Sequence, residues 1–354
     1  MQDRRSFLSA SAAGAGALFC SLKPLESASR ADVRAADLAA ARLQRPTGRA
    51  AVSSRDPVDR LRFATPEPQP GGMVREYWIE ASTTPWNITP IRRDGWMDMP
   101  VRGGTRFTAF AYREWTPGFA RPKGPATMPG PLLVGEVGDV LRVHVRNGDE
   151  KLGQAITMHP HGVRYTPDYD GTYAGALTRA GGFIAPGEEF TYTWECVPES
   201  VGVWPYHDHG PNHTLNLARG LFGALIVRPK GERPPDSETV LFQHALPPNV
   251  TGLDKQWQCF NGHAYAGNTP TVRAKVGQSV AFHVLGGDGA YHNFHVHGHR
   301  WRSAAGVSVD NAGFGPHEAI TARWTEDNPG RWLYHCHVFS HQDGGMAGWL
   351  LVDP

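Results

Sequence analysis

The feature that most constrains this chain is a set of histidine pairs in which one residue separates the two histidines. In chain order the four pairs are His159-Pro160-His161, His207-Asp208-His209, His295-Val296-His297 and His335-Cys336-His337, and His299 continues the third. Random placement of 17 histidines in 354 residues predicts about one such pair. Side chains two residues apart on a β-strand share one face, and imidazole is the commonest metal ligand. The pairs therefore predict metal sites carried by β-strands.

The spacing in the second half of the chain predicts two metal sites, back to back. In the fourth pair the two histidines point one way and Cys336, between them, points the other. The third pair shares one face, while His292, three residues before it, projects from the opposite face. One site therefore collects imidazoles in pairs, and the other collects His292 and Cys336.

The loop after the fourth pair offers two further ligands to the Cys336 site, His341 and Met346. Two imidazoles, a thiolate and a weak thioether describe a blue-copper electron-transfer centre. A zinc site would rarely recruit the methionine. We therefore expect copper at this site.

The fourth motif reads His335-Cys336-His337-Val338-Phe339-Ser340-His341 and is followed by Gly344-Gly345-Met346. In these motifs the chain resembles the multicopper oxidases and, among them, the two-domain small laccases. The resemblance implies four coppers per chain, namely one type-1, one type-2 and a type-3 pair. The implied ligands are His292, Cys336, His341 and Met346 for type-1 copper, His159 and His295 for type-2 copper, and His161, His207, His209, His297, His335 and His337 for the type-3 pair.

The rest of the sequence indicates an all-β protein with two cupredoxin-like domains, each a Greek-key β-sandwich. Glycine and proline are frequent, with 41 and 29 residues, and short strand-like runs lie between turns, which favours a sandwich over alternating strands and helices. The clearest predicted strands span 140–145, 189–195, 223–227, 239–243, 279–284 and 348–352. We expect the N-terminal domain at 71–230 and the C-terminal domain at 231–354.

The two predicted domains look like copies of one module. The second pair followed by His213 matches the fourth pair followed by His341, and residues 220–223 match residues 345–348. Asp208 then stands where the copper thiolate would be, and Leu221 where the axial methionine would be. We therefore expect the N-terminal domain to lack type-1 copper while keeping its share of histidine pairs.

The N-terminus predicts an export signal at 1–29. Arg4-Arg5-Ser6-Phe7-Leu8 opens a stretch of small and apolar residues, which fits a twin-arginine (Tat) signal and is too short and too rich in Gly and Ala for a transmembrane helix. We expect a periplasmic or extracellular protein with a flexible lead-in at 30–70. Cys196 and Cys259, which no copper site uses, are candidates for a disulfide.

The charge of the chain gives no support to two classes of partner. The net charge is +1 and charged residues make up 19% of the chain, so the sequence does not favour nucleic acid or a membrane surface. The expected partners are dioxygen, a small-molecule reductant and further copies of the chain. The family resemblance implies a head-to-tail homotrimer in which the first two histidine pairs of one subunit meet the last two of the next, which places trinuclear copper clusters at subunit interfaces.

The resemblance also implies a laccase-like activity, in which one-electron oxidation of phenolic or other organic reductants is coupled to four-electron reduction of dioxygen to water. Dioxygen reduction consumes protons, and Asp170 and Asp310 are the candidate proton relays. Both dipeptides, Asp-Gly and Asp-Asn, are also ordinary turn formers. Tyr165 matches a tyrosine that small laccases keep near the cluster, and Arg164 stands where they often have aspartate.

Other functions stay open at this point. A ferrous-ion oxidase would need carboxylates near type-1 copper, and a cuprous-ion oxidase would be expected to carry a methionine-rich insert, which the chain lacks. A copper nitrite reductase has its blue copper in the first domain, where Asp208 replaces the cysteine. A copper-sequestering protein would not need a blue site joined to a trinuclear one. The remaining histidines are predicted to be ordinary core or surface residues, with His299 the best candidate for supporting a ligand: His144, His244, His263, His283, His299 and His317.

Overall fold

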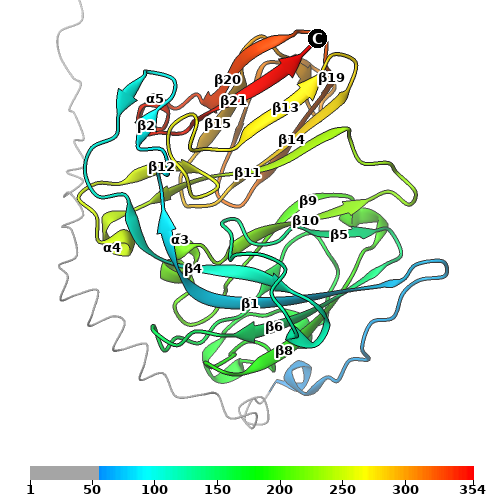
Figure 1. The fold of residues 1–354 in the computed structure, drawn as a ribbon. Helices are drawn as coiled ribbons and strands as arrows, with labels where there is room; N and C mark the ends of the chain where they lie inside the picture. The colour runs from blue at the N-terminus through cyan, green and yellow to red at the C-terminus, as the bar shows by residue number, and fades with distance from the viewer. Residues whose placement is uncertain (1–55) are drawn as a thin grey trace, which may run out of the picture.

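The computed structural model describes residues 56–354, which form two β-sandwiches (Figure 1). The strands of the first sandwich are β1 (Val74–Asn87), β4 (Arg106–Trp115), β5 (Leu133–Glu136), β6 (Val140–Asn147), β7 (His159–Pro160), β8 (Glu189–Glu195), β9 (Gly202–His207) and β10 (Phe222–Arg228). One sheet has the order β4-β1-β6-β8 and the other β5-β10-β9-β7.

The second sandwich repeats this plan. Its strands are β11 (Ser237–Leu246), β12 (Trp257–Phe260), β13 (Thr271–Lys275), β14 (Ser279–Gly286), β15 (His292–Val296), β18 (Asn311–Phe314), β19 (Ala319–Thr325), β20 (Gly330–Cys336) and β21 (Ala347–Asp353). The sheet orders are β12-β11-β14-β19 and β13-β21-β20-β15-β18. In both sandwiches the first long strand pairs in parallel with a later one, β1 with β6 and β11 with β14, as expected for copies of one module.

The remaining elements are short. Two small hairpins are β2 (Arg93–Asp94) with β3 (Met99–Pro100), and β16 (Trp301–Arg302) with β17 (Ser308–Val309). The helices are α3 (His213–Arg219), α4 (Pro248–Thr251) and α5 (Phe339–Asp343), with single 3-10 turns at η1 (Pro57–Arg60), η2 (Pro117–Phe119), η3 (Pro167–Tyr169), η4 (Gly175–Leu177) and η5 (Pro198–Ser200). Within residues 56–354, no helix has the length and apolar character needed to cross a membrane. The all-β prediction is confirmed, and each of the six predicted strands lies within an observed one.

Alternating side chains fill the space between the sheets of each sandwich. β13 shows the pattern clearly, since its burial alternates along the strand, as expected for a strand with one face on a core. The first core is centred on Phe110, Tyr192 and Trp194. The second is centred on Phe282 and Phe294 and also contains the metal-site residues Cys336 and Met346. The predicted blue-copper site is therefore part of a packed core, which fixes its side chains.

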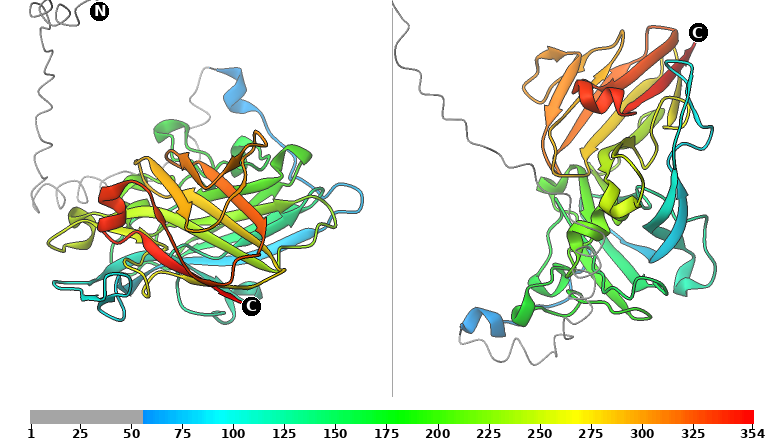
Figure 2. Two further views of the ribbon diagram at one scale, coloured as in Figure 1. Left: turned by 90° about the horizontal axis from the view of Figure 1, so that it is seen from above. Right: turned by 90° about the vertical axis from the view of Figure 1, so that its left-hand side faces the viewer.

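An apolar junction joins the two sandwiches. Every residue of β10 is buried, because one face of the strand packs into its own sandwich and the other against β11. Phe222 of β10 and Phe242 of β11 meet with ring centroids 4.8 Å apart, and Trp257 belongs to the same cluster. The right-hand view of Figure 2 shows the C-terminal sandwich stacked on the N-terminal one, as in Figure 1. The junction is a hydrophobic core rather than a flexible linker.

Glu238 adds an ionic contact to this junction. Its carboxylate lies 2.6 Å from Arg228 Nη2 of β10 and 3.0 Å from His283 Nε2 of β14. Burial opposes ionisation of Glu238, but the hydrogen bonds to His283 and Arg228 outweigh it and lower the pKa to about 2, from a usual value of 4.5. Because the folded-state pKa lies below the unfolded one, this carboxylate stabilises the fold above pH 4.5 and loses that effect as the pH falls toward 2.

We expect Glu238→Gln to lower the free energy of unfolding by about 2 kcal/mol at pH 7, the size typical of a hydrogen bond to a charged group. The difference from the unchanged protein should shrink as the pH is lowered from 4.5 toward 2. Urea unfolding of the metal-free protein at a series of pH values measures it, with Glu150→Gln, an exposed glutamate, as control. A difference that does not depend on pH would contradict the ionic role.

Two predictions concern the N-terminal segment and the cysteines. The predicted export signal at 1–29 and most of the lead-in at 30–70 lie outside the described residues. The described end of the lead-in contacts the first sandwich, where Arg179 donates to the backbone carbonyls of Asp59 and Leu61. Cys196 and Cys259 are free thiols buried in different core clusters, so the candidate disulfide is absent.

Candidate copper sites

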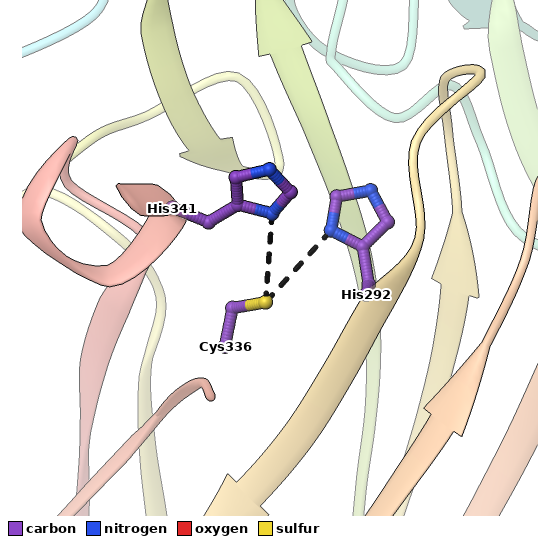
Figure 3. A group of neighbouring side chains, drawn as sticks. All are labelled: His292, Cys336 and His341. Carbon is purple, nitrogen blue, oxygen red and sulfur yellow. Dashed lines mark hydrogen bonds between the residues drawn. The ribbon is translucent and has the colours of Figure 1, made fainter. Parts of the chain in front are cut away.

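His292, Cys336 and His341 converge on one point in the second sandwich (Figure 3). His292 begins β15, Cys336 ends β20, and His341 lies on α5 just after β20. The Cys336 Sγ atom is 3.9 Å from His292 Nδ1 and 3.7 Å from His341 Nδ1. Bonds of about 2.3 Å from a metal to sulfur and about 2.0 Å to imidazole nitrogen span such gaps. The three atoms therefore fit around one small metal ion, and we call these residues the mononuclear set.

The surroundings prepare the mononuclear set for a metal. Asp288 Oδ1 lies 3.0 Å from His292 Nε2, which leaves Nδ1 of that ring facing Cys336. Burial opposes ionisation of the Cys336 thiol, but hydrogen bonds with His292 and His341 outweigh it and lower its pKa to about 6. Burial also opposes protonation of His292, whose pKa the Asp288 carboxylate and the thiol raise to about 9. The thiol is thus biased toward thiolate, the form that binds metals.

Met346, the fourth predicted ligand of this site, is fully buried beside Cys336. The Cys336 backbone N–H donates to the Met346 carbonyl at 3.1 Å, which ties the loop after α5 to the end of β20. The Met346 sulfur accepts a hydrogen bond from Gln243 Nε2 at 3.3 Å. The four residues that the sequence grouped together are therefore neighbours in the structure.

Four histidines lie on the other side of β15 and β20, and we call His295, His297, His335 and His337 the C-terminal quartet. His297 Nε2 and His335 Nε2 are 3.1 Å apart, which suits two imidazoles bound to one metal at about 2.0 Å each. The ring of His295 lies 5.1 Å from that of His297 and 5.6 Å from that of His337. Burial lowers the pKa of His335 to about 4, so this imidazole is neutral, as a metal ligand must be.

The first sandwich holds a matching set, His159, His161, His207 and His209, which we call the N-terminal quartet. His161 Nε2 and His207 Nε2 are again 3.1 Å apart. His159 pairs across the sheet with His207 just as His295 pairs with His335. Burial lowers the pKa of His161 to about 4 and that of His207 to about 2. The two quartets are equivalent positions of the duplicated module.

Backbone carbonyls orient two imidazoles in each quartet. In each case the Nδ1–H donates to a backbone carbonyl oxygen. The pairs are His159 to Asp170 at 2.7 Å, His207 to Asp208 at 2.8 Å, His295 to Asp310 at 2.6 Å and His335 to Cys336 at 2.9 Å. A hydrogen bond at one ring nitrogen directs the other toward a metal. These four histidines therefore present Nε2, and the donor set fits a multinuclear site of imidazoles.

Each quartet stands alone within one chain. Across residues 56–354, ring contacts join the members of each quartet, and none joins one quartet to the other. A metal site that needs histidines from both quartets therefore requires a second chain or a different arrangement of the two sandwiches.

Asp208 occupies the position in the first sandwich that matches Cys336 in the second. The counterparts of the mononuclear set and its methionine are Ile156, Asp208, His213 and Leu221. The fully buried carboxylate accepts hydrogen bonds from Thr157 N at 2.7 Å, Gly210 N at 3.3 Å and Asn216 Nδ2 at 3.0 Å. Burial raises its pKa to about 6 in spite of these bonds. Asp208 and Leu221 therefore stand where the thiolate and the methionine would be, as the sequence predicts, and Ile156 takes the place of His292.

We expect Asp208→Ala to destabilise the protein by about 3 kcal/mol or more, because three buried donors would lose their acceptor. Asp208→Asn should cost much less, because the Asn216 amide can turn and present its oxygen. Urea unfolding of the metal-free protein compares the two variants. Equal stability of the alanine variant and the unchanged protein would show that the carboxylate does not organise this region.

The three predicted catalytic residues lie beside the quartets in different ways. The Asp170 carboxylate is 3.3 Å from His159 Nδ1, and the Tyr165 ring is 5.9 Å from the His159 ring. Burial and then the Asp170 carboxylate raise the pKa of Tyr165. Asp310 contacts His295 through its backbone carbonyl, while its carboxylate accepts from Asn311 Nδ2 at 2.8 Å. Arg164, where small laccases often have aspartate, pairs with Glu195 at 2.5 Å.

Besides His213, whose ring stacks on that of His209, two further histidines touch the quartets. His299 donates from Nδ1 to the His297 carbonyl at 2.7 Å, and its Nε2 lies 2.9 Å from a carboxylate oxygen of Glu326. This is the supporting position that its spacing suggested. His317, predicted to be an ordinary residue, stacks on His207 with ring centroids 4.7 Å apart. It reaches the N-terminal quartet from the second sandwich, in the loop between β18 and β19. No local sequence signal marks such a contact, because it depends on how the two sandwiches pack.

Two multicopper oxidase family models match the chain, one at residues 125–232 and one at residues 239–354. Together they cover more than half of it and contain every residue of the mononuclear set and of both quartets. The chain belongs to the multicopper oxidase family. Family membership implies copper as the cofactor of this oxidase, and the donor sets described above fit that metal.

Curated relatives of the oxidase are much longer proteins. It is 32% identical over 245 residues to a probable nitrite reductase-hydroxylamine oxidoreductase fusion protein of Kuenenia stuttgartiensis, covering 64% of this chain and 28% of that protein. It is 26% identical over 350 residues to mouse hephaestin, covering 80% and 30%, and 27% identical over 341 residues to rat ceruloplasmin, covering 77% and 32%. The chain thus spans only 28–32% of the length of these relatives.

Solved structures of similar size share the fold. A multicopper oxidase matches with a TM-score of 0.63 and 25% identity, covering 79% of this chain and 89% of that one. The blue copper oxidase from Nitrosomonas europaea matches with a TM-score of 0.60 and 25% identity, covering 79% and 86%. A copper nitrite reductase from the same organism has a TM-score of 0.60 at 17% identity, covering 79% and 94%, and shows the fold alone.

Proposed function

We propose that this oxidase is laccase-like and couples one-electron oxidation of phenolic or other organic reductants to four-electron reduction of dioxygen to water. The observation that carries the proposal is the adjacency of two kinds of site on β20. Cys336 belongs to the mononuclear set, and its chain neighbours His335 and His337 belong to the C-terminal quartet. A site that takes up single electrons is thus one peptide unit away from a site that can hold several metals.

We assign the mononuclear set to type-1 copper with Met346 as axial ligand, His159 and His295 to type-2 copper, and the other six quartet histidines to a type-3 pair. Copper bound there supplies electron uptake at the first site and dioxygen reduction at the second. The chain contributes a short covalent path between them, reinforced by the hydrogen bond between His335 Nδ1 and the Cys336 carbonyl. Burial of His292 and Cys336 keeps water away from the thiolate.

Asp170, Tyr165 and Asp310 are the proposed residues for proton and electron supply near the quartets. The Asp170 carboxylate is within 3.3 Å of the proposed type-2 ligand His159, close enough to hold a proton there. The Tyr165 phenol is half-buried between that carboxylate and His159. Asp310 contributes by orienting His295 through its carbonyl.

We propose that the active form is a homotrimer in which the N-terminal quartet of one subunit meets the C-terminal quartet of the next. Support comes from the separation of the two quartets within one chain and from their matching geometry, with the same 3.1 Å nitrogen pair in each. A head-to-tail contact of this kind must close into a ring to avoid fibres. We further propose export by the twin-arginine route, on the evidence of Arg4-Arg5 and the apolar stretch after it.

A metal-ion oxidase is the second candidate, because hephaestin, ceruloplasmin and a human protein named as a ferroxidase are among the relatives. A copper nitrite reductase is disfavoured, since Asp208 replaces the cysteine of the first sandwich. Oxygen uptake by the copper-loaded protein with 2,6-dimethoxyphenol, and separately with ferrous or cuprous salts, tests the assignment. Rapid phenol-dependent uptake without peroxide release supports a laccase, whereas uptake with metal ions alone transfers the assignment to a metal oxidase.

A further inference from the structure

The β2–β3 hairpin belongs to the first sandwich in sequence but lies against the second, beside α5 (Figure 1), and Figure 2 shows this N-terminal segment running along the C-terminal sandwich. Gly95 N donates to the Ala266 carbonyl at 2.8 Å. The side chain of Asn268 accepts from Ile91 N at 2.9 Å and donates to the Arg93 carbonyl at 2.9 Å. These bonds hold the first arm of the hairpin and the start of its turn on the loop at 265–268.

A cavity of about 860 Å³ lies between this hairpin and the residues that follow His341 and Met346 in the chain. Its outer wall is formed by Trp96, Met97 and Met99, and its inner wall by Tyr265 and Ala347. The three hairpin side chains are large and apolar yet 37%, 57% and 58% exposed. Cavities of this size with apolar and aromatic walls suit small organic molecules.

The inner wall of the cavity is built from the type-1 loop itself. Gln342 and Asp343, which line it, directly follow His341 on α5, and Ala347 directly follows Met346. Tyr265 adopts a left-handed backbone conformation, with φ of 71°, and its N–H donates to the Gly345 carbonyl at 2.6 Å. A non-glycine residue held in that conformation needs support from its surroundings. A molecule in the cavity would therefore sit against residues adjacent to two type-1 ligands.

The polar groups of the cavity favour a neutral aromatic molecule over a metal cation. Asp94 is already used, since its Oδ1 accepts from the backbone N–H groups of Trp96 and Met97. Lys255 also lines the cavity and lies 4.0 Å over the Trp257 ring, so a positive charge is already present. Within the described part of the chain, the exposed Asp343 carboxylate has no hydrogen-bond or ion-pair partner and is free to accept a hydroxyl donor.

We propose that this cavity is the reductant site and that the β2–β3 hairpin determines its specificity for aromatic alcohols, with Asp343 accepting a hydrogen bond from the phenol hydroxyl. The inference rests on the proposed laccase-like function. It assigns reductant recognition partly to the N-terminal domain, which carries no type-1 ligand.

The test replaces Trp96, Met97 and Met99 together by alanine, and Asp343 by asparagine in a separate variant. Met73→Ala is the matched control, because Met73 is 56% exposed on the first sandwich and lies outside the cavity. We expect the triple variant to raise the KM for 2,6-dimethoxyphenol at least 10-fold, with kcat and the blue absorption unchanged. Asp343→Asn should raise KM for the phenol more than for 1,2-dimethoxy-4-aminobenzene. The control should match the unchanged protein.

Binding is measured independently of turnover, by calorimetric titration of 2,6-dimethoxyphenol into anaerobic, fully reduced holoenzyme. The site is supported if the triple variant loses phenol binding and the Met73→Ala control keeps it. If the triple variant binds phenol with the same affinity and KM as the original protein, and the original protein oxidises the phenol, the site is wrong but the proposed function stands. Phenol binding without oxidation by the unchanged protein overturns the function and keeps the site. A KM rise for cuprous ions instead of phenols would show that Met97 and Met99 bind metal, which overturns the aromatic assignment.

Gln243 supports a second, independent inference. It is fully buried in β11, its Nε2 donates to the Met346 sulfur at 3.3 Å, and its Oε1 has no partner among the described residues. A buried amide with an unpaired oxygen is costly, and a thioether is a weak acceptor. We infer that Gln243 is a positioning residue that weakens axial ligation by Met346 and thereby raises the type-1 reduction potential, which the axial ligand tunes.

Gln243→Leu and Gln243→Met remove the donor and introduce an apolar side chain of similar size. Redox titration of the blue absorption should give a lower type-1 potential in both variants than in the unchanged oxidase. Gln258→Leu is the control, since Gln258 is another buried glutamine and its amide is not bonded to Met346. An unchanged or higher potential in both variants, or an equal fall in the control, overturns the inference.

Discussion

Cys336→Ser is expected to yield a protein that is colourless at the blue-copper wavelength and oxidises reductants far more slowly than the unchanged oxidase. Serine keeps the shape of the side chain but replaces the soft sulfur ligand that selects copper. The rate should fall by well over the roughly 100-fold loss that changes outside the ligand set produce. Steady-state oxygen uptake and the visible spectrum of the same preparation measure the effect.

The quartet histidines provide the control for that result. Their environment does not include the Cys336 sulfur, which lies on the other side of β20. The serine variant should therefore lose one copper per chain and keep the rest, as measured by elemental analysis. A variant that retains the blue colour, or one that loses all of its copper, would contradict the division into two sites.

The second large effect on activity is expected when one histidine of either quartet is replaced. His161→Ala and His297→Ala each remove one member of a nitrogen pair that is 3.1 Å wide. Dioxygen reduction should fall to background in both variants, because a histidine that we assign to the type-3 pair is missing. The blue absorption should persist and should bleach when phenol is added, since the mononuclear set is intact. Stopped-flow absorption under anaerobic and aerobic conditions separates these two steps.

The control is His283→Gln, because it replaces a buried histidine that belongs to neither quartet. His283 pairs with Glu238 and Thr321 in the second sandwich and contacts neither site. Its variant should keep full dioxygen reduction even if it is less stable. Retained dioxygen reduction in both quartet variants would mean that the quartets are not the oxygen site.

The local part of this architecture could be predicted from the sequence. Strand periodicity placed His335 and His337 on one face and Cys336 on the other, and that parity survives in the structure because β20 is a regular paired strand. The duplication was readable for the same reason, since Asp208 and Leu221 align by simple spacing. Patterns with a period of two residues are local, so they need no knowledge of the tertiary fold.

The non-local part could not be predicted. His317 reaches His207 only because the sandwiches pack through β10 and β11, and the hairpin covers α5 only because Asn268 fixes it there. The contact between the Asp310 backbone carbonyl and His295 also has no local sequence signal. Cys196 and Cys259 were candidates for a disulfide until the structure placed them in separate cores. Each of these depends on contacts between residues far apart in the chain.

The central claim, that each multinuclear site is shared between two subunits, is tested most directly by mixing the two inactive variants. His161→Ala damages only the N-terminal quartet and His297→Ala only the C-terminal one. If the variants are unfolded, refolded together in equal amounts and loaded with copper, random assembly of a ring should restore about one quarter of the unchanged activity. Each variant refolded alone should stay inactive. A mixture as inactive as its components would show that each site is built within one chain, and the proposed ring would be wrong.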